Sequence, residues 1–453
     1  MHPQRKEDLI SAVPAGRPPL IPTARGGRSR GARPLAASGV RRAVSATALV
    51  VVLMLAVVGC GGAGVAPGAT ADTTHATGAA ARYTGPGPAP AGDAFYVPPA
   101  TLPAGEPGDI LWSRQVQAAG PLRGLDVELQ EVLYLSTDAQ GRRDAVSGII
   151  MLPSAAVRGS APVVGFATGT HGMGDACAPS KSIAAGTDDW LDAFQLAAHK
   201  GWVIAATDYE GLGTPGEHTY SVGRSEGHAV IDAVRAAQRL DGAGVRRDAK
   251  VAFWGYSQGG GAAAWAGELA PSYAPELNTV AVAAGGVPAD LIAVSEALNG
   301  AAWAGVIFMS ALGFDAAYPE LKLADYVHPE ARASLDRLST LCLKAALPEF
   351  AGKHIQDVLT TDPLQTPSWR TRLQENSLGR TPPAAPVYLY HGRKDTVVAF
   401  GQAEALAQAY CREGAKVTFV PYADDDHGAA SYRTDPVAFL TSRFAGEPAT
   451  STC

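Results

Sequence analysis

The sequence lacks features on which several large classes of protein depend. Its 43 Asp and Glu outnumber its 37 Lys and Arg, giving a net charge of −6, so the charge balance gives no reason to expect a nucleic-acid partner. Its histidines show no H-x-x-x-H or Cys/His ligand spacing, and we predict no metal site and no cofactor. An apolar run at 44–60 covers about 15 residues, which is short for a membrane span.

This apolar run is instead typical of the core of a signal peptide. It follows an arginine pair, and its last four residues, Val57 to Cys60, resemble a bacterial lipobox, in which the cysteine is lipidated. An uncleaved anchor helix is the alternative. We interpret residues 1–60 as an N-terminal extension with a lipoprotein-type signal peptide. The protein is therefore expected to be secreted, or held at the membrane surface through Cys60.

A change of composition follows the signal segment. Residues 61–92 are Gly, Ala, Pro and Thr with almost no large apolar side chains. Such a segment cannot bury enough surface to offset the entropy of ordering, so we predict a flexible linker. From residue 93 to residue 453 the pattern is that of one globular domain.

Four cysteines remain in the exported part, and an even number suggests two disulfides. Three connectivities are possible, and free buried thiols are the alternative, less favoured outside the cytoplasm. The four are Cys177, Cys342, Cys411 and Cys453.

Eight segments of the globular part are predicted as strands, and the last six are mostly continuous apolar runs. Such runs are typical of strands buried on both faces of a mostly parallel sheet. Helical patterns lie between them, and this alternation implies right-handed βαβ crossovers and an α/β fold. The predicted strands are 127–137, 145–154, 162–169, 202–209, 250–256, 279–286, 387–392 and 417–422.

One long connection interrupts this alternation. Residues 287–383 contain helix-like segments at 288–313 and 328–347 and no clear strand. So long a connection is unlike a bare loop. We predict a helical insertion that forms a cap, or lid, over the edge of the sheet.

The pattern Gly-x-Ser-x-Gly, typical of a nucleophile elbow between a strand and a helix, occurs twice. In GYSQG, at 255–259, an apolar strand precedes the motif and a helix of small residues follows it. In GRSEG, at 223–227, the preceding residues form a polar loop. We therefore predict Ser257 as the nucleophile and Ser225 as a helix N-cap.

A serine nucleophile needs a histidine to take its proton and a carboxylate to orient that histidine. Asp395 follows the seventh predicted strand and His427 the eighth, which gives the chain order Ser, acid, His of α/β hydrolases. The alternative for Asp395 is a helix cap. His391 would break this order, so we assign it a structural role.

The oxyanion of the tetrahedral intermediate needs two backbone N–H donors. One candidate is Gln258, directly after the nucleophile. The other is expected in the loop GTHGMGDACAPS, with Thr170 as first choice and His171 as second. The alternative for this loop is a simple glycine-rich turn.

Four stretches taken together resemble the secretory lipase family, the lipase-A type of yeasts and its actinobacterial relatives. They are ATGTHGMGDACAPS, ATDYEGLGTPGEHTYSVGRSEG, FWGYSQGGGAAAWAGELAP and HGRKDTVV. The resemblance implies an α/β-hydrolase core with a helical lid, carboxylic ester hydrolysis, and the triad Ser257, Asp395 and His427. It also implies a Cys177–Cys342 disulfide, which leaves Cys411 and Cys453 as a second pair by elimination.

The sequence thus predicts an exported serine carboxylic-ester hydrolase, a triacylglycerol lipase or esterase that uses an acyl-enzyme. The alternatives are a peptidase or cell-envelope deacylase on the same fold, and a non-catalytic surface lipoprotein. The expected partner is a lipid or other small-molecule ester. The apolar stretch at 303–314 is expected to line an acyl tunnel or, equally, to form the core of the lid.

Overall fold

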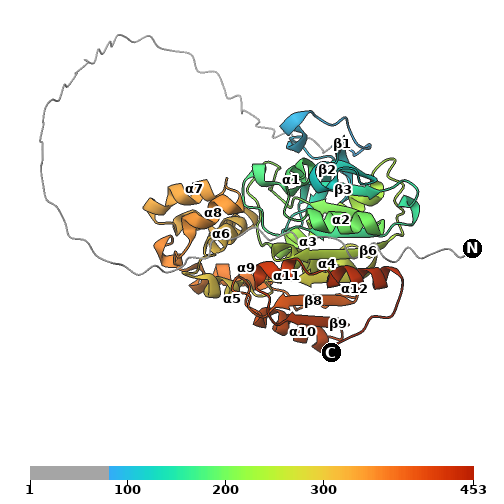
Figure 1. Ribbon diagram of the computed structural model, residues 1–453. Coiled ribbons are helices and arrows are strands. Elements are labelled where there is room, and N and C mark those ends of the chain that lie inside the picture. The colour runs from blue at the N-terminus through green and yellow to red at the C-terminus, as the bar shows by residue number, and fades with distance from the viewer. Residues whose placement is uncertain (1–80) are drawn as a thin grey trace, which may run out of the picture. The chain divides into compact units, whose positions relative to one another are not determined.

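The computed structural model describes residues 81–453 (Figure 1). The predicted signal peptide, its lipidation site Cys60 and most of the predicted linker lie outside the described residues. No helix within the described part of the chain is long and apolar enough to cross a membrane.

One sheet of nine strands organises the described residues (Figure 1), in the order β1-β2-β3-β5-β4-β6-β7-β8-β9. The first three strands pair antiparallel, as do β3 and β5, and the remaining neighbours are parallel. The strands are β1 Ile110–Val116, β2 Val127–Thr137, β3 Arg143–Pro153, β4 Val163–Ala167, β5 Val203–Thr207, β6 Lys250–Tyr256, β7 Asn278–Gly285, β8 Val387–Gly392 and β9 Val417–Tyr422.

The prediction of eight strands was one short, because β1 was missed. Its sequence, ILWSRQV, is buried only in its first half and has the polar run Ser-Arg-Gln in its second half. It lies at the edge of the sheet and pairs only with β2. An edge strand does not need to be apolar on both faces, so the pattern that identifies buried strands does not apply to it.

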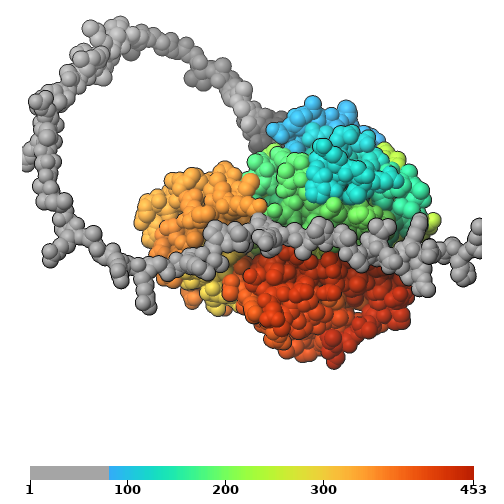
Figure 2. Space-filling view, in the orientation of Figure 1, coloured from blue at the N-terminus to red at the C-terminus, as the bar shows by residue number. Residues whose placement is uncertain are grey.

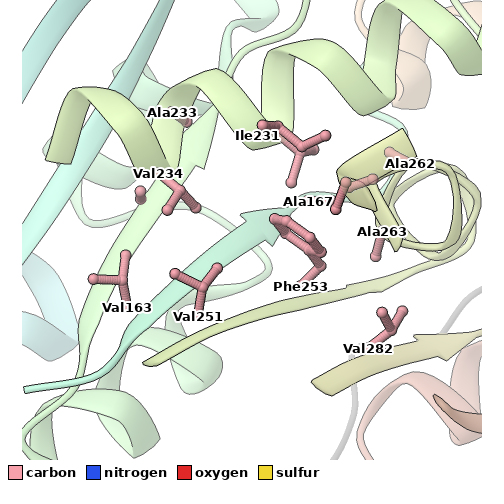
Figure 3. Packing of buried hydrophobic residues seen from close by; sticks show 14 of the residues in the cluster. Val163, Ala167, Ile231, Ala233, Val234, Val251, Phe253, Ala262, Ala263 and Val282 are labelled. Atoms are coloured by element: carbon pink, nitrogen blue, oxygen red, sulfur yellow. The ribbon is translucent and has the colours of Figure 1, made fainter. Parts of the chain in front are cut away.

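Helices cover both faces of the sheet. Successive residues of β6 alternate between them: Val251 and Phe253 join the apolar cluster with α3, α4 and α10, and Ala252 and Trp254 join the cluster with α1, α2 and α12. Figure 3 shows Phe253 among side chains of α3 and α4. The helices are α1 Pro179–Ala185, α2 Leu191–Lys200, α3 Gly223–Arg239, α4 Gln258–Tyr273, α10 Gly401–Arg412, α11 His427–Ser431 and α12 Asp435–Phe444.

The segment between β7 and β8 is a helical insertion whose side chains, among them Phe308, Phe314 and Trp369, form most of an apolar cluster separate from those of the sheet. Each of the two predicted helical segments is broken in two; the first break contains Gly300, at φ +80°. In Figure 2 the orange atoms, which include α7 and α8, form a lobe beside the sheet region. The helices are α5 Leu291–Leu298, α6 Gly305–Ala317, α7 Arg332–Leu338, α8 Leu343–Phe350 and α9 Pro367–Glu375.

Folded structure begins before the predicted boundary at residue 93. The Gly87 backbone N–H donates to the Leu111 carbonyl oxygen at 2.8 Å, and the Tyr83 hydroxyl donates to the Ile110 carbonyl oxygen at 2.8 Å. These contacts attach a segment poor in apolar side chains to the start of β1. Backbone hydrogen bonds of this kind do not depend on amino-acid composition. The linker predicted from composition at 61–92 therefore extends into the folded part of the chain.

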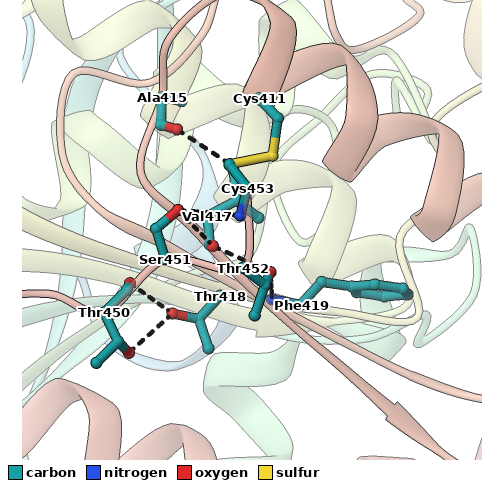
Figure 4. Close-up of a disulfide and its surroundings, with 9 residues drawn as sticks. All are labelled: Cys411, Ala415, Val417, Thr418, Phe419, Thr450, Ser451, Thr452 and Cys453. Atoms are coloured by element: carbon teal, nitrogen blue, oxygen red, sulfur yellow. Dashed lines mark hydrogen bonds between the residues drawn. A yellow bond between two sulfur atoms is a disulfide. The ribbon is translucent and has the colours of Figure 1, made fainter.

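The four cysteines among residues 81–453 form two disulfides, Cys177–Cys342 and Cys411–Cys453. The second holds the C-terminal tail against β9, where the Thr452 backbone N–H donates to the Val417 carbonyl oxygen at 2.7 Å and the Thr418 hydroxyl donates to the Thr450 carbonyl oxygen at 2.9 Å (Figure 4). Because β9 is an edge strand, this tail covers backbone groups that would otherwise be open to pairing.

Candidate active site

Ser257 occupies a sharp turn between β6 and α4. Its backbone has φ 61° and ψ −123°, a combination that costs a residue other than glycine about 1–3 kcal/mol. Two glycines permit the turn. A Cβ atom at Gly255 would lie 2.2 Å from the Gly259 carbonyl oxygen, and one at Gly259 would lie 2.0 Å from the Ala167 carbonyl oxygen. The spacing of GYSQG therefore has a steric cause at both flanking positions.

The structure brings together Ser257, Asp395 and His427, which follow β6, β8 and β9. The His427 Nε2 atom lies 2.9 Å from the Ser257 Oγ atom, and its Nδ1 atom lies 2.6 Å from the Asp395 Oδ2 atom. Since Nδ1 faces a carboxylate, it carries the proton, and Nε2 is left to accept from the serine hydroxyl. This is the arrangement in which an imidazole can act as a general base toward serine.

The His427 backbone is fixed from two directions. The Tyr256 hydroxyl donates to the His427 carbonyl oxygen at 2.7 Å. Asp426 caps the short helix α11, which begins at His427, by accepting from the Ala429 backbone N–H at 2.8 Å. The imidazole therefore extends from a capped helix start whose carbonyl is tied to the residue before the nucleophile.

Asp395 has more partners than the sequence indicated. Its Oδ1 atom accepts from the Val397 and Val398 backbone N–H groups at 2.8 and 2.9 Å, so it also caps the following turn. Burial would raise the pKa of Asp395, but hydrogen bonds from His391 and His427 outweigh burial and hold that pKa well below its ordinary value. The carboxylate is thus ionised throughout the neutral range.

His391 lies against the acid as well. Its Nε2 atom is 3.0 Å from the Asp395 Oδ2 atom and 2.8 Å from the Val398 carbonyl oxygen. Sequence reasoning gave this histidine only a structural role and missed the contact with the acid. The four-residue spacing in HGRKD was the available signal, but the turn that brings the two side chains together is not encoded in any local pattern.

The two first-choice oxyanion candidates line one pocket with the serine. Gln258 is the first residue of α4, and Thr170 faces the same pocket with its hydroxyl 2.9 Å from the Tyr220 hydroxyl. His171 does not line the pocket, and its Nε2 atom lies 2.8 Å from the Asp188 Oδ2 atom. Burial would lower the pKa of His171, but its hydrogen bond with Asp188 raises that pKa above the ordinary value.

The loop that carries Thr170 is attached to the helical insertion. The Met173 backbone N–H donates to the Leu341 carbonyl oxygen at 2.9 Å, and the Leu343 backbone N–H donates to the His171 carbonyl oxygen at 2.8 Å. The Cys177–Cys342 disulfide joins the same two segments. This loop is therefore more than the simple glycine-rich turn weighed as an alternative.

The pocket at Ser257 has a volume of about 610 Å³, and most of its lining residues belong to the helical insertion, chiefly to α5 and α6. A second cavity of about 390 Å³ inside the helical insertion shares four lining residues with it, Ser295, Ile307, Ser310 and Leu373. Some residues of the stretch at 303–314 line the pocket and others form the core of the insertion; that the stretch holds an acyl chain stays a prediction. The pocket is lined by Thr170, Tyr220, Ser221, Ser257, Gln258, Pro288, Leu291, Val294, Ser295, Leu298, Trp303, Val306, Ile307, Ser310, Leu373, Val397 and Val398.

Ser225 is not the N-cap that the sequence suggested. Helix α3 begins at Gly223, so Ser225 lies inside its first turn, 1% exposed, with its hydroxyl donating to the Glu210 carboxylate. The helix start is supported instead by Glu226, whose Oε1 atom accepts from the Ser221 backbone N–H at 2.9 Å. The prediction failed because the helix starts inside the polar loop, two residues before the serine.

Comparison with known proteins identifies the family. A profile of the secretory lipase family matches residues 178–452, more than half of the chain. This chain belongs to the secretory lipase family. It is 29% identical over 383 residues to a secreted triacylglycerol lipase of Malassezia globosa, with 80% of this chain and 81% of that protein covered.

Two further relatives extend the comparison. A probable inactive lipase of Mycobacterium tuberculosis is 29% identical over 383 residues, covering 80% of this chain and 84% of that protein. The solved structure of lipase A of Candida antarctica in its closed state superimposes with a TM-score of 0.71 at 22% identity, covering 79% of this chain and 87% of that one. The α/β-hydrolase fold is confirmed, and the family supports a carboxylic-ester hydrolase of the lipase or esterase type that acts outside the cell.

Among residues 81–453, no three His, Cys, Asp or Glu side chains are grouped so that they could hold a metal ion.

Proposed function

We propose that the protein is a serine lipase or esterase in which Ser257 is the nucleophile, His427 the general base and acid, and Asp395 the orienting acid. The observation that carries this proposal is the unbroken chain of hydrogen bonds from Asp395 through His427 to Ser257, which ends at a pocket. The strained backbone of Ser257 supports it, because strain of this kind is concentrated at functional sites.

In the proposed reaction the Ser257 Oγ atom attacks the ester carbonyl carbon while its proton passes to His427 Nε2. The carbonyl oxygen becomes an oxyanion, and the backbone N–H groups of Gln258 and Thr170 are the proposed donors to it. When the C–O bond breaks, His427 returns the proton to the leaving alcohol. A water molecule then repeats the sequence on the acyl-enzyme and releases the acid.

The lining of the pocket favours an ester with an apolar acyl chain. Leu291, Val294, Leu298 and Ile307 present hydrocarbon next to Ser257, and the second cavity continues this surface into the insertion. Burying a hydrocarbon chain gains about 0.8 kcal/mol per CH₂ group, so such a site selects for chain length. We propose triacylglycerols or other long-chain esters as substrates.

A peptidase or a cell-envelope deacylase would use the same chemistry on this fold. The test is turnover by the purified protein of esters with short, medium and long acyl chains, beside aminoacyl amides. We expect kcat/KM to rise with chain length over the first several carbons and the amides to be inert. Faster turnover of the amides would favour the peptidase.

A non-catalytic surface lipoprotein is the second candidate, because one similar relative is named a probable inactive lipase. The complete hydrogen-bonded set around Ser257 argues against it. Folded protein that turns over none of the esters would favour this candidate.

The arrangement of the chain is also part of the proposal. We propose that residues 1–60 direct export, that lipid is attached at Cys60, and that a short linker leads to the catalytic domain, with 287–383 as its lid. Cells fed a labelled fatty acid should incorporate label into the wild-type protein and not into Cys60→Ala. Label that survives this change would argue against a lipid anchor at Cys60.

A further inference from the structure

Glu226, the acid of the GRSEG segment, lies behind the pocket and has no role in the chemistry proposed so far. It is 3% exposed. Its Oε1 atom accepts two hydrogen bonds, from Gln258 Nε2 at 2.8 Å and from the Ser221 backbone N–H at 2.9 Å. Both partners line the pocket at Ser257. One buried carboxyl thus connects two separate parts of the pocket wall.

The side chain of Gln258 is held at a second point. Its Nε2 atom lies 3.3 Å from His218 Nε2. The His218 Nδ1 atom faces the Glu210 carbonyl oxygen at 2.8 Å and must carry the ring proton, so Nε2 is free to accept. Burial lowers the pKa of His218 to about 4, and the ring stays neutral. Both hydrogens of the Gln258 amide are therefore bound, one by Glu226 and one by His218.

The other partner of Glu226 has an unusual backbone. Ser221 has φ 64°, in the left-handed region that disfavours residues other than glycine. Its neighbour Tyr220 contacts the Thr170 hydroxyl at 2.9 Å. The hydrogen bond from Ser221 to Glu226 therefore stabilises a strained turn next to the residue that contacts Thr170. Glu226 thus contacts Gln258 directly, and through Ser221 it supports the turn next to Thr170, the other proposed oxyanion residue.

We propose that Glu226 is a positioning residue for ester hydrolysis: it fixes Gln258, and with it the backbone N–H proposed to donate to the oxyanion. This inference rests on the function proposed above. Burial raises the pKa of Glu226 to about 7, and Oε1 can accept a hydrogen bond in either protonation state. Glutamine at this position should therefore preserve most of the effect, whereas alanine should remove it.

Glu268 provides a matched control on α4. It is 5% exposed, and burial raises its pKa to about 7, as for Glu226. It accepts from the Tyr410 hydroxyl at 2.8 Å and from the Gly379 backbone N–H at 2.7 Å. None of these three residues lines the pocket. Removing Glu268 disturbs a comparable buried hydrogen-bond network without touching Gln258.

The experiment measures kcat and KM for a long-chain ester in the wild type and in Glu226→Ala, Glu226→Gln, Glu268→Ala and Glu268→Gln. We expect Glu226→Ala to lower kcat about tenfold and to change KM less than about twofold, because an oxyanion donor acts mainly in the transition state. Glu226→Gln should recover kcat to within about threefold of wild type. Both Glu268 variants should keep the wild-type kcat.

Gln258→Ala removes the same contact from the other side and keeps the backbone N–H. It should reproduce the fall in kcat, and the double variant with Glu226→Ala should fall no further, as expected for residues that act as one unit. This variant also tests the inference if Glu226→Ala does not fold. Additive losses, or equal kcat in Glu226→Ala and Glu268→Ala, would overturn the inference alone. A wild-type protein without ester turnover would overturn the proposed function and this inference with it.

Discussion

The two Gly-x-Ser-x-Gly pentapeptides have the same pattern and opposite surroundings. Ser257 follows a buried strand, has a strained backbone at φ 61°, and faces a pocket. Ser225 lies in the first turn of α3, buried, with its hydroxyl bonded to Glu210 and 3.0 Å from the Thr219 hydroxyl. The Ser257 hydroxyl can therefore donate to His427, whereas the Ser225 hydroxyl is hydrogen-bonded to neighbouring side chains.

The flanking glycines also differ in what they allow. In GYSQG they let backbone approach backbone, since a Cβ atom at Gly259 would meet the Ala167 carbonyl oxygen. In GRSEG they let one helix approach another: a Cβ atom at Gly223 would lie 1.9 Å from the Trp265 Nε1 atom of α4. The same spacing therefore marks an elbow in one place and a helix crossing in the other.

The largest expected effect that tests this comparison comes from Ser257→Ala. Loss of the nucleophile should lower kcat by roughly 10⁶-fold, as for other serine hydrolases. The measurement is ester turnover, with the unfolding midpoint as a control for folding. Residual turnover within about 100-fold of wild type would mean that the nucleophile is elsewhere.

Asp395→Asn should have the next largest effect. An amide in place of the carboxylate favours the wrong tautomer of His427, and kcat should fall by about 10³- to 10⁴-fold. Stopped-assay rates on one ester suffice for this measurement. An unchanged kcat would mean that Asp395 does not take part in catalysis and only caps the turn at Val397 and Val398.

The paired glycine variants Gly259→Ala and Gly227→Ala compare the two motifs by stability. The first places a Cβ atom 2.0 Å from a backbone carbonyl oxygen, and the free energy of unfolding should fall by about 3 kcal/mol. The second meets the Leu269 Cδ1 atom at 2.9 Å, the Trp265 Cβ atom at 3.0 Å and the Ala266 backbone nitrogen at 3.1 Å. These contacts are about 1 Å longer than the one at Gly259, so the loss should be smaller, about 1 kcal/mol. Chemical denaturation measures both, and equal losses would contradict the steric account of the elbow.

Ser225→Ala should have the smallest effect. Turnover should stay within about threefold of wild type, because the hydroxyl contacts no residue of the proposed triad. Stability should fall by about 1 kcal/mol, since the half-buried Glu210 carboxyl loses a donor. A large loss of kcat at unchanged stability would break the distinction between the two serines.

The parts of the fold that sequence could predict are those with a local cause. Buried strands such as β6 are continuous apolar runs, and Gly201 ends α2 in the left-handed conformation, with φ 71°. The edge strand β1 carries no such signal because only its first half is buried, and the contact of Gly87 carries none because it is made by the backbone.

In the candidate site, too, some residues could be predicted from the sequence and some contacts could not. Ser257, Asp395 and His427 each follow a strand. The strand and helix on either side of GYSQG predicted Ser257, and the order along the chain then predicted Asp395 and His427. The contacts from His391 to Asp395 and from Glu226 to Gln258 join segments whose approach depends on tertiary packing. These two contacts could be identified only from the three-dimensional structure.

The central claim is that one of two serines in the same sequence pattern is the nucleophile, and covalent labelling tests it most directly. The folded protein would be treated with a fluorophosphonate, digested, and mapped by mass spectrometry. We predict a single modified site at Ser257 and an unmodified Ser225. Modification at Ser225, or none at either serine of a correctly folded protein, would contradict the account.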